Sequence, residues 1–76
     1  MIKEHDRIVL TAAVTEQGLV PGDVGTVVHV YGKNKAFEIE FLSLEGKTAA
    51  IATVEASKVR PVHRSEITHA RQFAVA

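Results

Sequence analysis

The stretch of sequence that decides the fold is Gly22–Val28, which reads GDVGTVV. Its glycine and aspartate residues are typical of a tight turn, and the β-branched run that follows them is typical of a strand. We expect Gly22 or Gly25 to need a backbone conformation that a β-carbon disfavours. We also expect Asp23 to stabilise the turn by accepting backbone amides rather than to bind a ligand. The stretch therefore predicts a loop that leads directly into a β-strand.

Apolar and polar residues alternate with the period of a strand on both sides of this stretch. The clearest case is 36–42, where Phe37, Ile39 and Phe41 alternate with two glutamates and are expected to face the core. The loop at 12–23 is long, and its Leu19 and Val20 are apolar enough to fold back over one end of the sheet. Short turns are expected at 32–35 and 44–47, with a single helical turn at 55–57. The predicted strands are 6–11, 24–31, 36–42, 48–54 and 58–62.

Five short strands separated by turns every 8 to 12 residues predict an all-β domain, a small SH3-like five-stranded barrel with a short C-terminal helix or tail. Residues 1–63 are assigned to the barrel. Residues 64–76 are assigned to a C-terminal helical tail of the same domain.

The tail carries apolar residues at the spacing of one helix face. Ser65 is expected to cap a short helix, and Ile67, Ala70, Phe73 and Ala74 would form its apolar stripe. A helix of about 10 residues does not persist alone in water. The stripe must therefore dock on the barrel, on a second copy of the chain or on another protein, or else the tail is disordered.

The composition restricts the class of protein. The 76 residues suffice for one domain, and the absence of cysteine excludes disulfides and thiolate zinc sites, which is in keeping with a cytoplasmic location. The N-terminus is charged, and no window approaches the roughly 18 apolar residues of a membrane span. We therefore expect a soluble protein with no membrane segment.

The charges are unevenly distributed although the net charge is zero. Residues 1–55 carry a net charge of −3 and residues 56–76 a net charge of +3. A nucleic-acid binder usually has a dense basic stripe, which the body of this chain lacks. The charge distribution therefore favours a protein partner over a nucleic acid.

The stretches 1–10, 22–28 and 54–62 together resemble a family of small bacterial proteins of unknown function, with a Gly-Asp-x-Gly-Thr-Val-Val turn, over nearly the whole chain. That resemblance implies an SH3-like barrel and the role of a small accessory or antitoxin-like subunit. The Gly-Asp-x-Gly-Thr-Val element also resembles the turn of ribosomal and transcription-factor KOW modules. Those modules tend to carry more basic and glycine residues around the turn than this chain does.

Catalytic and metal-binding patterns are weak. The histidines at positions 5, 29, 63 and 69 have no spacing typical of a zinc site, and His29 is expected to be a solvent-facing residue of its strand. Glu38 and Glu40 share one strand face, where a solvated acidic surface is the ordinary interpretation and a docking surface for a basic partner is the functional one. We therefore expect no enzyme, no metal and no cofactor.

The leading hypothesis is a non-catalytic protein-binding module, an accessory or antitoxin-like partner of a larger protein or a homodimer. Its expected contact residues are Leu19, Val20, Ile67, Ala70 and Phe73. The alternative is a KOW-like protein that binds RNA or the ribosome. The expected contact residues of that alternative are Lys33, Lys35, Lys58, Arg60, Arg64 and Arg71.

Overall fold

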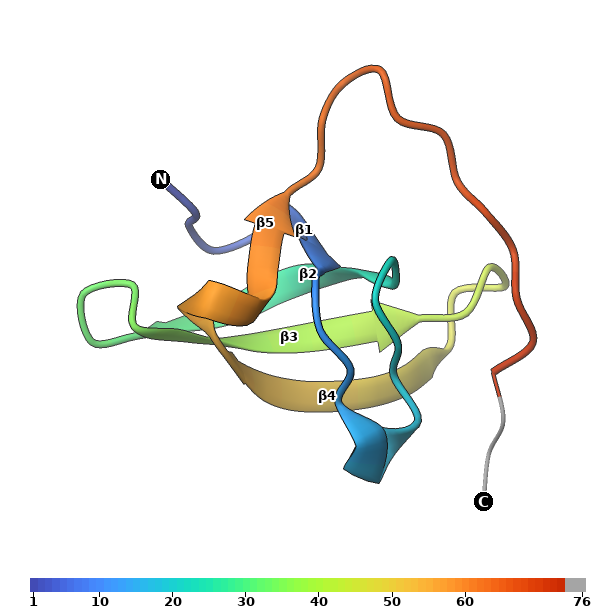
Figure 1. Cartoon of the computed structure of the whole chain (residues 1–76), viewed down its shortest axis with the longest axis horizontal. Coiled ribbons are helices and arrows are strands. Elements are labelled where there is room, and N and C mark those ends of the chain that lie inside the picture. Colours follow the sequence, from blue (N-terminus) through green and yellow to red (C-terminus); the bar gives the residue numbers. More distant parts are fainter. Residues whose placement is uncertain (74–76) are drawn as a thin grey trace.

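A single five-stranded antiparallel sheet makes up most of the structure, a computed structural model that describes residues 1–73. Its strands are β1 (Arg7–Leu10), β2 (Val24–Tyr31), β3 (Ala36–Leu42), β4 (Thr48–Glu55) and β5 (Val59–Pro61). They lie in the order β4-β3-β2-β1-β5, so β4 and β5 form the two edges and the sheet is not closed. The sheet is strongly twisted, and β5 runs steeply across the direction of β3 and β4 (Figure 1). The predicted all-β architecture of five strands is confirmed.

The core lies on the inner face of this sheet and follows the predicted alternation. Phe37, Ile39 and Phe41 of β3 are all buried, whereas Glu38 and Glu40 point to the other face. Ile8 and Leu10 of β1 also join the core. Together with these five residues, the buried cluster contains Leu19, Val27, Ala52 and Val54.

The loop at 12–23 folds back on the core. It contains the 3-10 helix η1 (Thr15–Gln17), and the backbone groups of Val14 and Leu19 bond each other at 3.0 and 3.1 Å. This small hairpin inserts Leu19 into the core, where its exposed fraction is 2%. Next to it, the Gln17 side-chain amide donates to the Ile51 carbonyl at 2.8 Å and so covers part of the β4 edge.

The two glycines of the GDVGTVV stretch are required for different reasons. Gly22 has a φ of +97°, a left-handed conformation that side chains disfavour, as the turn predicts. Gly25 lies in β2 and faces the core, where a β-carbon would collide with the Cγ2 atom of Ile39 and lie 2.9 Å from the Phe41 ring. The first glycine therefore serves the turn and the second serves packing.

An irregularity in β2 changes which side chains face outward. The pairing with β3 shifts between Val27 and His29, so Val28 is an extra residue in the ladder. Val28 and His29 are both exposed, although regular alternation would place one of them inside. His29 faces solvent as predicted, and the bulge leaves the neighbouring Val28 exposed as well.

The tail contains no helix within residues 62–73, so the predicted C-terminal helix is wrong there. Ser65 lies in a turn closed by the Glu66 amide, which donates to the His63 carbonyl at 3.0 Å, and it begins no helix. The tail leaves the end of β5, arcs away from the sheet and then runs back along the molecule (Figure 1). Ala74, the last member of the predicted stripe, lies outside the described residues.

Candidate interaction surface

Arg71 of the tail is bound by the loop that precedes β2. Its Nε atom donates to Asp23 Oδ1 at 2.8 Å and its Nη2 atom to Asp23 Oδ2 at 2.6 Å, so the ion pair is bidentate. Nη2 also donates to the backbone carbonyl of Gly18 at 3.0 Å. A bidentate pair between arginine and carboxylate is stronger and more directional than a single ionic contact. The loop therefore fixes both the position and the orientation of the guanidinium group.

The Asp23 carboxylate is held in place by its own turn. Its Oδ2 atom accepts the Val20 amide at 2.9 Å, which confirms the prediction that Asp23 stabilises the turn. The Asp23 carbonyl in turn accepts the Leu10 amide at 2.9 Å and so ties the turn to the end of β1. Partial burial opposes ionisation of Asp23, but the hydrogen bonds from Arg71 and Val20 outweigh it and hold its pKa below the usual value.

Phe73 provides an apolar contact two residues beyond Arg71. Its side chain is half-buried and packs against the core cluster. The guanidinium carbon of Arg71 lies 5.7 Å from the centre of the Phe73 ring, within the range of a cation–π interaction. Residues 71–73 are thus attached at one charged point and one apolar point.

A second ion-pair cluster fixes the start of the tail. Both terminal nitrogens of Arg60 donate to Glu66, at 3.0 and 2.6 Å, and the His63 amide also donates to that carboxylate at 2.6 Å. The bond from Arg60, with that of the His63 amide, lowers the pKa of Glu66 to about 2. Between the two attachments, residues 67–70 are exposed, and Ile67 has an exposed fraction of 93%.

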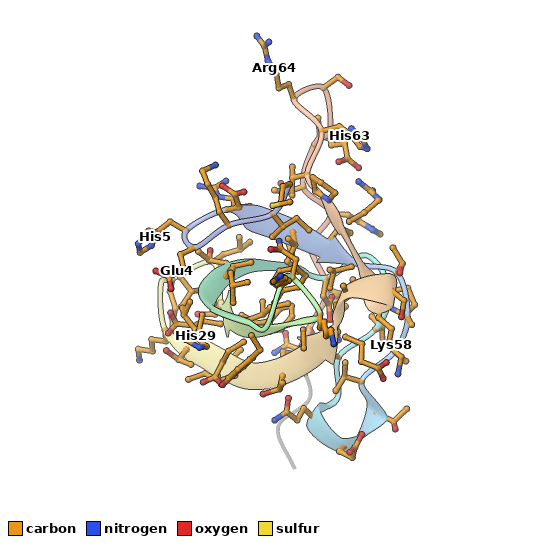
Figure 2. All side chains as sticks on the ribbon, turned by 90° about the vertical axis from the view of Figure 1, so that its left-hand side faces the viewer. Glu4, His5, His29, Lys58, His63 and Arg64 are labelled. Atoms are coloured by element: carbon orange, nitrogen blue, oxygen red, sulfur yellow. The ribbon has the colours of Figure 1, made fainter. Side chains whose placement is uncertain are left out.

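A separate polar cluster lies on the outer face of the sheet. Tyr31 donates to Glu38 at 2.6 Å, which raises the pKa of the tyrosine, and the rings of His29 and Tyr31 meet edge to face with their centres 4.5 Å apart. Glu4 lies beside His29, with 3.9 Å between Oε2 and Nδ1 (Figure 2). The Glu38 carboxylate is therefore hydrogen-bonded to Tyr31 instead of being fully solvated.

Comparison with protein families matches residues 4–61 to DUF4926, a domain of unknown function. The chain belongs to this family. The match includes all five strands and ends at the last residue of β5. No curated protein and no solved structure matches the chain. The expectation of a family of unknown function is thus confirmed.

The contacts of Arg71 and Phe73 with the rest of the chain, which we call the tail site, involve residues inside and outside the DUF4926 match. Gly18 and Asp23, which accept the guanidinium group, lie inside the matched residues, whereas Arg71 and Phe73 lie outside them. The surface of the DUF4926 domain therefore binds a segment that follows it in the sequence and has no regular structure. Neither Gly18 nor the pairing of Asp23 was anticipated, because opposite charges 48 residues apart give no local signal.

The residues predicted to contact a protein partner are in three different environments. Leu19 is part of the core of the DUF4926 domain and presents almost no surface, so it is not available as a contact. Phe73 is half-buried against the same core. Val20, Ile67 and Ala70 are exposed, but without a helix the last two do not form a stripe with Phe73.

Three of the six residues predicted for RNA binding are engaged in ion pairs. Arg60 and Arg71 pair with Glu66 and Asp23, and Lys58 lies 3.9 Å from Glu55. Arg64 projects from the top of the tail (Figure 2). The two lysines of the β2–β3 hairpin, Lys33 and Lys35, lie at the end of the sheet near Lys58, because the Lys35 carbonyl accepts the Ala56 amide of η2 (Ala56–Lys58) at 3.0 Å.

Residues 1–73 contain no group of three histidine, aspartate or glutamate side chains arranged to hold a metal ion.

An open apolar groove of about 350 Å³ is lined by Met1, Ile2, Asn34, Phe37, Ala56 and Pro61. Within residues 1–73, no helix has both the length and the apolar character needed to cross a bilayer.

Proposed function

We propose that this protein is a non-catalytic protein-binding module of the cytoplasm, an accessory or antitoxin-like partner of a larger protein. The observation that carries the proposal is the attachment of residues 71–73 to the loop at 12–23. A surface that offers a carboxylate, a backbone carbonyl and an apolar contact to a segment without regular structure has the elements of peptide recognition. We also infer an SH3-like fold, supported by the strand order and by η2 between β4 and β5.

RNA binding of the KOW type is the second candidate. It is supported by the hydrogen bond between the β2–β3 hairpin and η2, which gathers Lys33, Lys35 and Lys58 at one end of the sheet. It is weakened by the ion pairs of Arg60 and Arg71, because a cation already paired with a carboxylate attracts phosphate less.

Site-specific photo-crosslinking in cells distinguishes the two candidates. A photoreactive residue is placed singly at Val20, beside the tail site, at Lys33, on the hairpin, and at His29, on the outer face as the control. The protein-binding proposal predicts a discrete protein adduct at Val20 that exceeds the adduct at His29. A nucleic-acid adduct at Lys33, with no excess of protein at Val20, would overturn it in favour of RNA binding.

A further inference from the structure

We propose that the Asp23 site of the DUF4926 domain recognises segments with the pattern arginine, any residue, aromatic. The chain's own Arg71–Phe73 segment occupies this site in cis, and such a segment of a partner protein displaces it. The inference rests on the proposed function and specifies the chemistry of the partner.

The polar half of the site matches a guanidinium group. Two carboxylate oxygens of Asp23 and the Gly18 carbonyl converge on the planar donors of Arg71, at 2.8, 2.6 and 3.0 Å. The Nη1 atom of Arg71 also donates to the Gln72 carbonyl of the tail itself at 3.4 Å. The Asp23 side chain has an exposed fraction of only 16%, and the Val20 amide fixes its orientation. A lysine ammonium could not reproduce this bidentate geometry, so the site selects arginine.

The apolar half of the site accounts for the spacing. Arg71 and Phe73 both meet the domain, while Gln72 between them is exposed. The cation–π contact between Arg71 and Phe73 also joins the two side chains, so an aromatic residue fits this position better than an aliphatic one.

The cis attachment is easily reversible. Residues 67–70 are exposed and have no regular structure, and an ion pair with partly exposed partners contributes little free energy. The effective concentration of a tethered segment is on the order of millimolar, so a site with a Kd of about 100 µM would be mostly occupied in cis. A competing segment with additional contacts can therefore replace the tail.

The expected occupant is a partner protein and not a second copy of this chain. Exchange of tails between two copies forms the same contacts that each copy already has in cis, without the advantage of the tether. A different protein can gain more, because Val20 and Val24 on either side of Asp23 have exposed fractions of 40% and 43%. These two valines offer apolar surface next to the site that the tail leaves open.

The test measures binding of a fluorescent peptide with the sequence of residues 67–73 to full-length variants. The double variant Arg71→Ala/Phe73→Ala vacates the site. If circular dichroism shows that this double variant is unfolded, the single variant Arg71→Ala is used in its place. We expect the peptide to bind the vacated chain about tenfold more tightly than the wild type, in which the tail competes at an effective concentration of about 1 mM. Arg64→Ala, which changes an exposed arginine of the tail, is the matched control and should bind as weakly as the wild type.

Two further changes test the recognition itself. Asp23→Asn in the vacated chain, which keeps an acceptor for Val20, should weaken binding at least about tenfold, as should lysine for arginine in the peptide. Equal binding to the wild type, the vacated chain and its Asp23→Asn derivative would overturn the inference, as would concentration-dependent dimers of the wild type in light scattering.

If this inference fails while a protein adduct forms at Val20, the proposed function stands. If the peptide binds and no adduct forms, the proposed function fails.

Discussion

The sheet of the DUF4926 domain and the tail that follows it are stabilised by different interactions. The sheet buries a continuous cluster of nine apolar residues, and its strands are joined by backbone ladders. The tail from residue 62 to residue 73 has no regular structure and is attached by two ion-pair clusters and one aromatic side chain. Hydrophobic burial does not depend on charge, whereas ion pairs at the surface weaken with salt and with protonation. The tail is therefore the part of the chain that solution conditions or a competing ligand can release.

The largest effect is expected from truncation of the core of the sheet. Phe41→Ala removes a buried ring and should lower the free energy of unfolding by about 3 to 5 kcal/mol. Glu40→Ala, one position away on the outer face, loses only a surface hydrogen bond to Thr48 and should cost less than about 1 kcal/mol. Urea denaturation measures both. Equal losses would mean that the register of β3 is wrong.

The next largest effect is expected from substitution of Gly22 and Gly25. Gly25→Val forces a side chain against Ile39 and Phe41 and should destabilise the domain by about 1 to 3 kcal/mol. Gly22→Ala meets no neighbouring atom within 4 Å and costs only the left-handed backbone strain, about 1 to 2 kcal/mol. Thermal melting of both variants should therefore show a larger loss for Gly25→Val, and the reverse order would contradict the packing role of Gly25.

Acid should release the tail before it unfolds the sheet. The folded-state pKa of Glu66 is about 2, and that of Asp23 also lies below its usual value. The stabilisation from each pair is complete above the unfolded-state pKa and is lost as the pH falls through the folded-state pKa. Amide chemical shifts of residues 66–73 should move to random-coil values as the pH falls from about 4.5 to 2, while those of β3 stay dispersed. Simultaneous loss of both sets would show that the tail and sheet form one cooperative unit.

The smallest effect is expected at Ser65. A helix cap replaced by alanine typically costs about 1 kcal/mol, but Ser65 caps no helix here. Ser65→Ala should therefore leave the melting temperature and the far-ultraviolet circular dichroism unchanged. A clear loss of helical signal in this variant would restore the helical interpretation of the tail.

The strands were predictable because their signals are local. The bounds of β2 and β3 agree with the predicted ranges, since the alternation in 36–42 and the β-branched run after Gly25 reflect residues two positions apart on one face. The burial of Leu19 also follows from its apolar character within a long loop. The same burial excludes the predicted role of Leu19 as a partner contact.

The features that were not predictable depend on distant residues or on backbone irregularities. The spacing of Ile67, Ala70 and Phe73 resembles a helix face, but the tail has no helix there and Arg71 pairs with Asp23. Nothing near Arg71 in the sequence identifies that partner. Likewise, nothing in the run around Val28 marks the bulge that places Val28 and His29 both on the surface.

The most direct test of the cis attachment is a nuclear Overhauser measurement on the full-length protein at neutral pH and low salt. The structure predicts cross-peaks between the ring protons of Phe73 and methyl groups of the core cluster, and their loss in the Asp23→Asn variant while the cross-peaks within the sheet persist. Random-coil shifts for residues 71–73 in the wild-type protein, with no cross-peak from Phe73 to the core, would contradict the attachment of the tail.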